Sequence, residues 1–176
     1  MPNWCSNQIR IGGPTEEIER IWDILEDPGS DYGLCSALAP LSSEWEYNDA
    51  ISTWGTKWDV TDGNLQLNNE GDYSEITGYF DSAWSPPTEA VRNWLEKNPD
   101  CDADLLYCEF SNDFMGTLDE EFDISSTPVS WFLGNETGIA LDEAFDIIGM
   151  KEELLEEEYK EILNEPLTLL NPETEV

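Results

Sequence analysis

Hydrophobic and polar positions near the start of the chain predict a strand followed by a helix. In residues 4–11, WCSNQIRI, isoleucines alternate with polar residues, which is the two-residue period of a strand. Gly12, Gly13 and Pro14 end this segment, and Thr15 is placed to cap a helix. The next apolar residues recur at the spacing of one buried helix face, up to Asp27 and Pro28: Ile18, Ile21, Trp22 and Leu25.

The middle of the chain predicts two further strands and a second helix. Residues 29–47 are loop-like. From Trp58 to Thr61 apolar and polar residues alternate, which indicates the start of a strand, and Asp62-Gly63 is a turn signal. Alternation returns in residues 65–67 and continues through residues 74–84. Apolar residues at helical spacing then begin after Ser85-Pro86-Pro87-Thr88, and Asn98-Pro99 ends that helix.

Residues 104–110 complete the order strand, helix, strand, strand, helix, strand, and residues 114–116 extend the last strand as a hairpin. Two βα units joined by a hairpin predict an α+β fold of the ferredoxin-like βαββαβ type, an antiparallel sheet with two helices on one face. Right-handed crossovers fit both units. We assign residues 1–120 to this domain.

Residues 121–176 predict an acidic, mostly helical extension packed on the domain. The pattern of residues 123–138 fits either a loop or a short strand. Residues 151–163 predict a helix with Leu154, Leu155 and Tyr159 on one side and glutamates on the rest. Because each like-charge pair costs such a helix about 0.2–0.5 kcal/mol, its apolar side has to dock on the domain or on a partner. A homodimer through this side stays open.

Charge is what sets the composition apart: 40 Asp and Glu stand against 7 Lys and Arg, for a formal net charge of -33. Self-repulsion of this size opposes a compact state, so the charge needs a use or a screening environment. Without a cationic surface the chain is not expected to bind nucleic acid directly, nor an anionic membrane. No signal-peptide pattern or membrane-spanning apolar run is present, which predicts a location in the host cytoplasm.

Residues with recognisable catalytic or metal-binding patterns are scarce. There is no histidine, and Cys5, Cys35, Cys101 and Cys108 have no CxxC spacing, so we expect free thiols rather than a zinc site. No GxxxxGK[ST] phosphate loop occurs. The acidic run after Asp59 places its glycine one position early for an EF-hand calcium loop. The sequence therefore predicts no catalytic residue, no metal and no cofactor.

The segment 54–62, WGTKWDVTD, places a lysine between two tryptophans. Lys57 fits a catalytic amine or a cation–π partner. The favoured interpretation is a lysine at the start of a strand whose stem lies over core tryptophans. The tryptophans as a set are likewise predicted to lie in the core, because a stacking platform would need several of them exposed.

Three short motifs occur in order: MPNWCSN, WGTKWDV and FDSAWSPP. Together they resemble the YubB-like ferredoxin-fold family of plasmid- and phage-borne proteins, over roughly residues 1–118. The resemblance implies a ferredoxin-like fold and an origin in a mobile element. The family assigns no catalytic residues. The crowding of acidic residues and the tail after Glu121 depart from its pattern.

Charge and resemblance together predict a non-enzymatic inhibitor from a phage or mobile element that imitates nucleic acid. A duplex carries one negative charge per about 1.7 Å of axis, and carboxylates on rigid helices can imitate such spacing. The partner would be a host defence protein with a basic groove, such as a restriction, CRISPR or related nuclease, approached with electrostatic steering. Two alternatives stay open: an adaptor or scaffold for another basic protein, and a salt-adapted protein without mimicry.

The predicted partner-binding residues lie in rows or dense runs, which favours mimicry over the even spread that salt adaptation would produce. Four are on the first helix: Glu16, Glu19, Asp23 and Glu26. The others form two runs: Asp119, Glu120, Glu121 and Asp123, and then Glu152, Glu153, Glu156, Glu157, Glu158 and Glu161.

Overall fold

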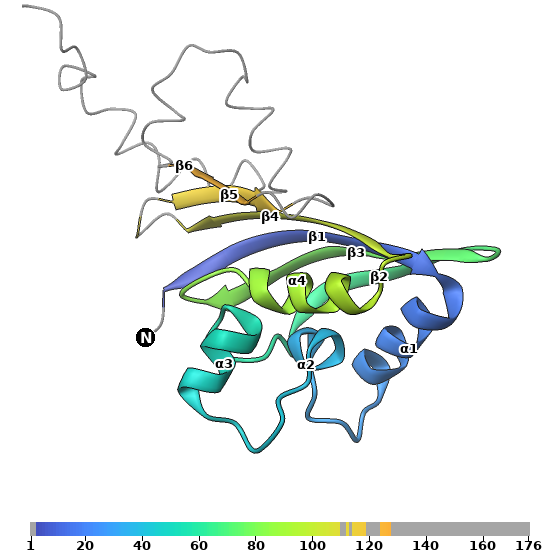
Figure 1. The fold of residues 1–176 in the computed structure, drawn as a ribbon, viewed down its shortest axis with the longest axis horizontal. Coiled ribbons are helices and arrows are strands. Elements are labelled where there is room, and N and C mark those ends of the chain that lie inside the picture. The colour runs from blue at the N-terminus through green and yellow to red at the C-terminus, as the bar shows by residue number, and fades with distance from the viewer. Residues whose placement is uncertain (1–2, 110–111, 113, 119–123, 128–176) are drawn as a thin grey trace, which may run out of the picture.

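The computed structural model describes residues 3–109, 112, 114–118 and 124–127. In these residues the chain forms an α+β fold, in which four helices lie on one face of a six-stranded antiparallel sheet (Figure 1). The elements in chain order are β1 (Trp4–Pro14), α1 (Thr15–Glu26), α2 (Leu34–Leu38), α3 (Tyr47–Trp54), β2 (Gly63–Glu70), β3 (Tyr73–Ala83), α4 (Thr88–Lys97), β4 (Asp102–Glu109), β5 (Phe114–Leu118) and β6 (Ile124–Thr127).

The strand order across the sheet is β2-β3-β1-β4-β5-β6, and every neighbouring pair is antiparallel. β1 is the central strand. It pairs with β3 along its whole length, from Trp4 opposite Ala83 to Pro14 opposite Tyr73, and with β4 on its other side. β6 lies within the predicted extension 121–176 and continues the sheet.

The core fills the space between the sheet and the helices. Ile9 and Ile11 of β1 are buried there, while Arg10 between them points to the opposite face. Apolar residues at helical spacing in the sequence are buried against the sheet, as predicted. The buried helix residues include Ile18, Ile21, Val91, Trp94 and Leu95.

The α+β class, the helices at α1 and α4, and the strands at β1, β3 and β4 are confirmed within a few residues. Thr15 is not the N-cap, because Pro14 occupies that position and Thr15 is the first helical residue. The Thr15 hydroxyl instead bonds to the Gly71 carbonyl (2.9 Å) and the Ser74 hydroxyl (2.8 Å). The predicted helix 151–163 lies outside the described residues.

The structure of residues 29–62 differs from the prediction. The short helix α2 lies inside the stretch 29–47 that was expected to be loop, and α3 begins at its end, so the described residues place four helices rather than two on the sheet. Helices of 5 and 8 residues are too short to display a clear period. Residues 58–61 are not a strand: Val60 is buried, while the Asp59 side chain bonds to the start of α2. Asp62-Gly63 is not the hairpin turn either, since β2 begins at Gly63 and the chain turns at Gly71, φ 74°.

Candidate functional site

The four acidic residues predicted on the first helix share one exposed face of α1. Their positions are Glu16, Glu19, Asp23 and Glu26, and all four are exposed. At a rise of about 1.5 Å per residue they span about 15 Å, or one charge per about 5 Å. A single DNA strand carries one charge per about 3.4 Å of axis. This acidic row therefore has about two thirds of the linear charge density of one strand.

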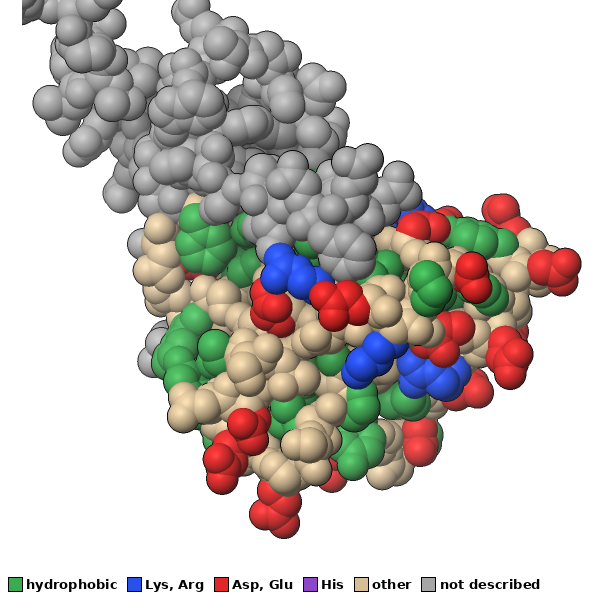
Figure 2. All heavy atoms as spheres, viewed as in Figure 1, with side chains coloured by type: hydrophobic (Ala, Val, Ile, Leu, Met, Phe, Trp, Pro, Cys, Tyr) green, Lys and Arg blue, Asp and Glu red, His purple; other side chains and the backbone are tan. Residues whose placement is uncertain are grey.

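None of the ion pairs among the described residues involves the acidic row. The acids that form ion pairs with other described residues are Glu17, Glu75, Glu89, Asp102 and Asp104, and none belongs to the row. Figure 2 shows one face of the molecule, with acidic side chains spread around its margin and the few basic ones gathered nearer the middle. The carboxylates of the row are therefore available to a partner.

Glu17, the remaining acid in the first turn of α1, has a structural role instead. Its carboxylate accepts hydrogen bonds from the Arg20 guanidinium (2.7 and 2.9 Å) and from the Trp94 indole N–H (2.8 Å). The bond from Arg20, helped by the one from Trp94, outweighs burial and lowers the pKa of Glu17 below its ordinary value. Glu17 thus ties α1 to α4.

The other predicted acids, Asp119, Glu120, Glu121, Asp123 and the six glutamates of residues 152–161, lie outside the described residues. Their contribution to a partner-binding surface stays a prediction.

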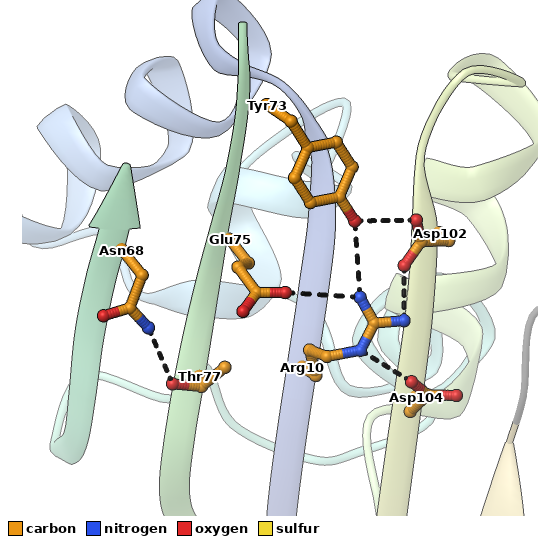
Figure 3. A network of polar contacts seen from close by, with 7 residues as sticks. All are labelled: Arg10, Asn68, Tyr73, Glu75, Thr77, Asp102 and Asp104. Carbon is orange, nitrogen blue, oxygen red and sulfur yellow. Dashed lines mark hydrogen bonds and ion pairs between the residues drawn. The ribbon is translucent and has the colours of Figure 1, made fainter. Parts of the chain in front are cut away.

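Arg10 is fully engaged on the face of the sheet opposite the helices (Figure 3). Its guanidinium pairs with Glu75 (3.5 Å), Asp102 (2.5 Å) and Asp104 (2.8 Å), which joins β3, β1 and β4. Tyr73 donates to Asp102 (2.9 Å) at the edge of this network. Burial works to lower the pKa of Arg10, but the bonds to Asp104 and Asp102 hold it above its ordinary value. Arg10 is a permanent cation held by the sheet's own carboxylates.

The three short motifs meet at one end of the sheet, where β1 begins and β3 and α3 end (Figure 1). The hydrogen bonds that join them include those from the Trp84 N–H to the Asn3 carbonyl (2.9 Å), from the Thr56 hydroxyl to the Ala83 carbonyl (3.0 Å) and from the Ser85 hydroxyl to the Gly55 carbonyl (2.6 Å). Gly55 permits this approach: it has φ 84°, and a Cβ there would lie 3.1 Å from the Pro86 carbonyl oxygen.

Asp59 fixes the second motif to α2. Its carboxylate accepts hydrogen bonds from the backbone N–H groups of Gly33 (2.9 Å), Cys35 (2.8 Å), Ser36 (3.3 Å) and Val60 (2.8 Å). A carboxylate at the first turn of a helix satisfies N–H groups that have no partner within the helix. Residues 55–62 are therefore held in place although they form no helix or strand.

An exposed aromatic surface surrounds Lys57 at this end. We call it the tryptophan–lysine cluster: Trp4, Tyr47, Lys57, Trp58 and Trp84. The Lys57 ammonium lies 4.6 Å from the Trp58 ring centroid and 4.5 Å from that of Trp84. Trp4 packs on Trp58 (6.2 Å between centroids) and Tyr47 on Trp84 (6.3 Å). The four rings are 40–52% exposed. In Figure 2 hydrophobic side chains reach the surface at this end of the molecule.

The prediction that the tryptophans lie in the core is right for Trp54 and Trp94 and wrong for half of the set. The exposed ones are Trp4, Trp45, Trp58 and Trp84. Lys57 does lie over tryptophan rings, as predicted, but these rings are exposed and the segment is not a strand. The available signal was position: Trp4 and Trp58 begin a segment of strand-like alternation, Trp84 ends one just before Ser85-Pro86-Pro87, and Trp45 lies in the loop-like stretch 29–47.

Trp84 has a strained backbone. Among the described residues other than glycine, it alone has a positive φ, 73°. This conformation costs a residue with a Cβ about 1–2 kcal/mol, and it persists only where the surroundings enforce it. Here the Ser82 hydroxyl donates to the Ser85 carbonyl (2.8 Å), and the Asn7 amide donates to Ser82 (2.9 Å). The fold thus holds Trp84, whose indole is exposed, in an unfavourable backbone conformation.

A cavity of about 980 Å³ opens on the helical side, next to the cluster. Trp58 belongs to both, and Trp45, Trp54 and Trp94 also line the cavity. Its volume suits a small molecule. However, two of its carboxylates already have hydrogen-bond partners. Glu17 is bonded to Arg20 and Trp94, and Asp59 is bonded to backbone N–H groups.

The cysteines are free thiols, as predicted. Burial raises the pKa of Cys5 and, with Asp59 adding to it, that of Cys35. Burial also raises the pKa of Cys101 to about 11, with Glu17 contributing. These three thiols stay protonated near neutral pH and are poor nucleophiles. In the described part of the chain, no three Cys, Asp or Glu side chains are grouped as metal ligands.

Comparison with protein-family models, curated proteins and solved structures finds no match for this chain. The search for membrane spans, limited to the described residues, finds no helix with the length and apolar character to cross a bilayer.

Proposed function

We propose that the protein is a non-enzymatic inhibitor whose acidic surface occupies the cationic nucleic-acid site of another protein. The observation that carries this proposal is the acidic row of α1, four exposed carboxylates that form no ion pair with any described residue. Their linear density is close enough to that of a nucleic-acid strand for a basic groove to accept them. The runs at residues 119–123 and 152–161 would add further charge to the same partner.

The charge balance supports an anionic binding role. Residues 1–109 contain 22 acidic and 5 basic residues. Of these basic residues, Arg10, Arg20 and Arg92 are held in ion pairs and Lys57 lies over tryptophan rings. A surface with so little competing positive charge steers a basic partner toward it and speeds association at low salt.

The resemblance of the three motifs to a plasmid- and phage-borne family supports a host defence nuclease as the target. We also propose that β1, α1, β2, β3, α4 and β4 form the ferredoxin-like arrangement, with α2 and α3 inserted before β2. The order β2-β3-β1-β4 with antiparallel neighbours supports this assignment.

The test is capture of the partner from host lysate at low and raised salt, followed by competition with duplex DNA. We expect a nucleic-acid-binding protein that is released by salt and by DNA. Replacing the acidic row (Glu16→Gln, Glu19→Gln, Asp23→Asn and Glu26→Gln together) is expected to weaken binding by about tenfold or more.

The matched control removes four exposed charges that do not form a row: Glu44→Gln, Glu46→Gln, Asp62→Asn and Glu70→Gln together. Equal weakening by both variants would show that net charge, not the row, determines binding. A partner without a nucleic-acid site would replace mimicry with the adaptor role. Capture that ignores salt would assign the affinity to apolar contacts. Loss of all activity from a single carboxylate-to-amide change would indicate an enzyme.

A further inference from the structure

We propose that Trp58 and Trp84 form a binding site for a cationic side chain of a protein partner, which Lys57 fills in the unbound protein. The choice of a basic partner rests on the proposed function. The existence of the cation site rests on the geometry of the tryptophan–lysine cluster alone.

The position of the Lys57 ammonium shows what this surface attracts. It lies 4.6 Å from one ring centroid and 4.5 Å from the other, well inside the limit of about 6 Å for a cation–π contact. One positive charge is thus shared by two indole rings. Both rings are 40% exposed, so a group from solvent can reach them.

The rings are fixed and the lysine is replaceable. Trp84 is held by its strained backbone and by the bond from its N–H to the Asn3 carbonyl (2.9 Å). Trp58 is braced by Trp4 on one side, and its neighbour Asp59 is bonded to α2. Lys57 ends a flexible stem and makes no ion pair with any residue that the structure describes. Its ammonium can therefore leave without breaking the framework.

The occupant follows from charge. A net charge of -33 attracts cations and repels phosphates and acidic ligands. A neutral apolar ligand would displace the ammonium without replacing its interaction with the rings. An arginine or lysine side chain replaces it in kind, and the planar guanidinium of arginine also stacks on indole. The acidic row at the other end of the sheet draws in the same class of partner.

Lys57 makes the site selective. An incoming cation competes with an ammonium tethered beside the rings, so a lone cation binds the unmodified protein weakly. A partner that binds the acidic surface first presents its own cation at high effective concentration and displaces Lys57. Removing the Lys57 charge is expected to strengthen binding of a small cation by about tenfold, which corresponds to the strength of one cation–π contact.

Choline is the probe, titrated into the full chain while the indole N–H resonances of Trp58 and Trp84 are followed in 1H–15N NMR spectra. The test variant is Lys57→Met, which keeps an apolar stem. The control is Lys97→Met, which removes the same charge from an exposed lysine on α4. The neutral isostere 3,3-dimethylbutan-1-ol separates cation–π binding from hydrophobic contact.

We expect choline to shift both resonances in all three proteins. Its affinity should be about tenfold higher for Lys57→Met than for the unmodified protein or for Lys97→Met. The neutral isostere should bind none of the three. Equal choline affinity in Lys57→Met and Lys97→Met, or equal binding of the isostere, would overturn the cation site. This titration uses no partner, so its failure would leave the acidic-surface proposal standing. Conversely, failed capture of a basic partner would leave the cation site standing.

Discussion

The acidic row of α1 and the tryptophan–lysine cluster lie at opposite ends of the sheet and are built in opposite ways. The row is four residues of one regular helix, exposed and without ion pairs to other described residues. The cluster joins three segments distant in sequence through backbone and hydroxyl hydrogen bonds. Charge can be carried by interchangeable side chains, whereas a cation site between two rings requires fixed positions.

This difference separates the two contributions that we propose to partner binding. The row would attract a partner at long range, and salt would screen this attraction beyond a Debye length of about 8–10 Å. The cluster acts only on contact and depends on ring orientation. Substitutions at the two ends should therefore differ in both size and kind of effect.

The largest effect is expected for Asp59→Ala, which removes the brace of the cluster. Four backbone N–H groups would lose their carboxylate acceptor, so the free energy of unfolding should fall by about 3 kcal/mol, measured by urea denaturation. Asp62→Ala is the control, an exposed acid three positions away, and should change stability by less than about 0.5 kcal/mol. Similar values for both variants would mean that Asp59 does not hold the segment.

An intermediate effect is expected for Glu17→Gln, at the one carboxylate of α1 that bonds to Arg20 and Trp94. The folded-state pKa of Glu17 is lowered, so its stabilisation is present above the ordinary value of 4.5 and is lost as pH falls through the folded-state pKa. The variant should lose about 1 kcal/mol at neutral pH, and the deficit should shrink in urea melts below pH 4.5.

Glu16→Gln, one residue earlier and exposed, is the comparison for Glu17 and should lower stability at neutral pH by less than about 0.5 kcal/mol. A deficit for Glu17→Gln that stays constant with pH would mean that the shape of the side chain matters rather than its charge.

The smallest effect on stability is expected for the fourfold replacement of the acidic row. Unlike the other two variants, it should not lower the free energy of unfolding. The replacement removes the repulsion of three like-charge pairs at helical spacing, which stabilises α1. It also removes the favourable interaction of Glu16 with the helix dipole in the first turn, which partly offsets this gain. Thermal unfolding should show stability unchanged or raised by about 0.5 kcal/mol, although the same variant is expected to bind its partner more weakly. A clear loss of stability would give the row a structural role and remove the contrast with the cluster.

The predictable parts of the fold are those with a repeated pattern. β1, α1 and β3 display their period in the sequence, α4 has one apolar face, β4 has a run of apolar residues, and the sequence identifies all five. α2 has 5 residues and α3 has 8, and their stability comes from packing on neighbours and, for α2, from the distant carboxylate of Asp59. No local pattern records such a contact.

The same limit applies to the site. The exposure of the acidic row follows from helical geometry and was readable in advance. The cluster depends on Trp4, Trp58 and Trp84 meeting across the ends of three elements, which periodicity does not address. The motifs that contain these residues were recognisable, but their meeting in space was not.

The central position of β1 sets the order of events during synthesis. Trp4 pairs with Ala83 and Ser6 with Cys108, so the first strand made has no partner until most of the domain has been translated. At about 5–20 residues per second the nascent chain exposes Ile9 and Ile11 for several seconds. The acidic row follows β1 immediately and places charge beside this apolar strand, where it opposes association between growing chains.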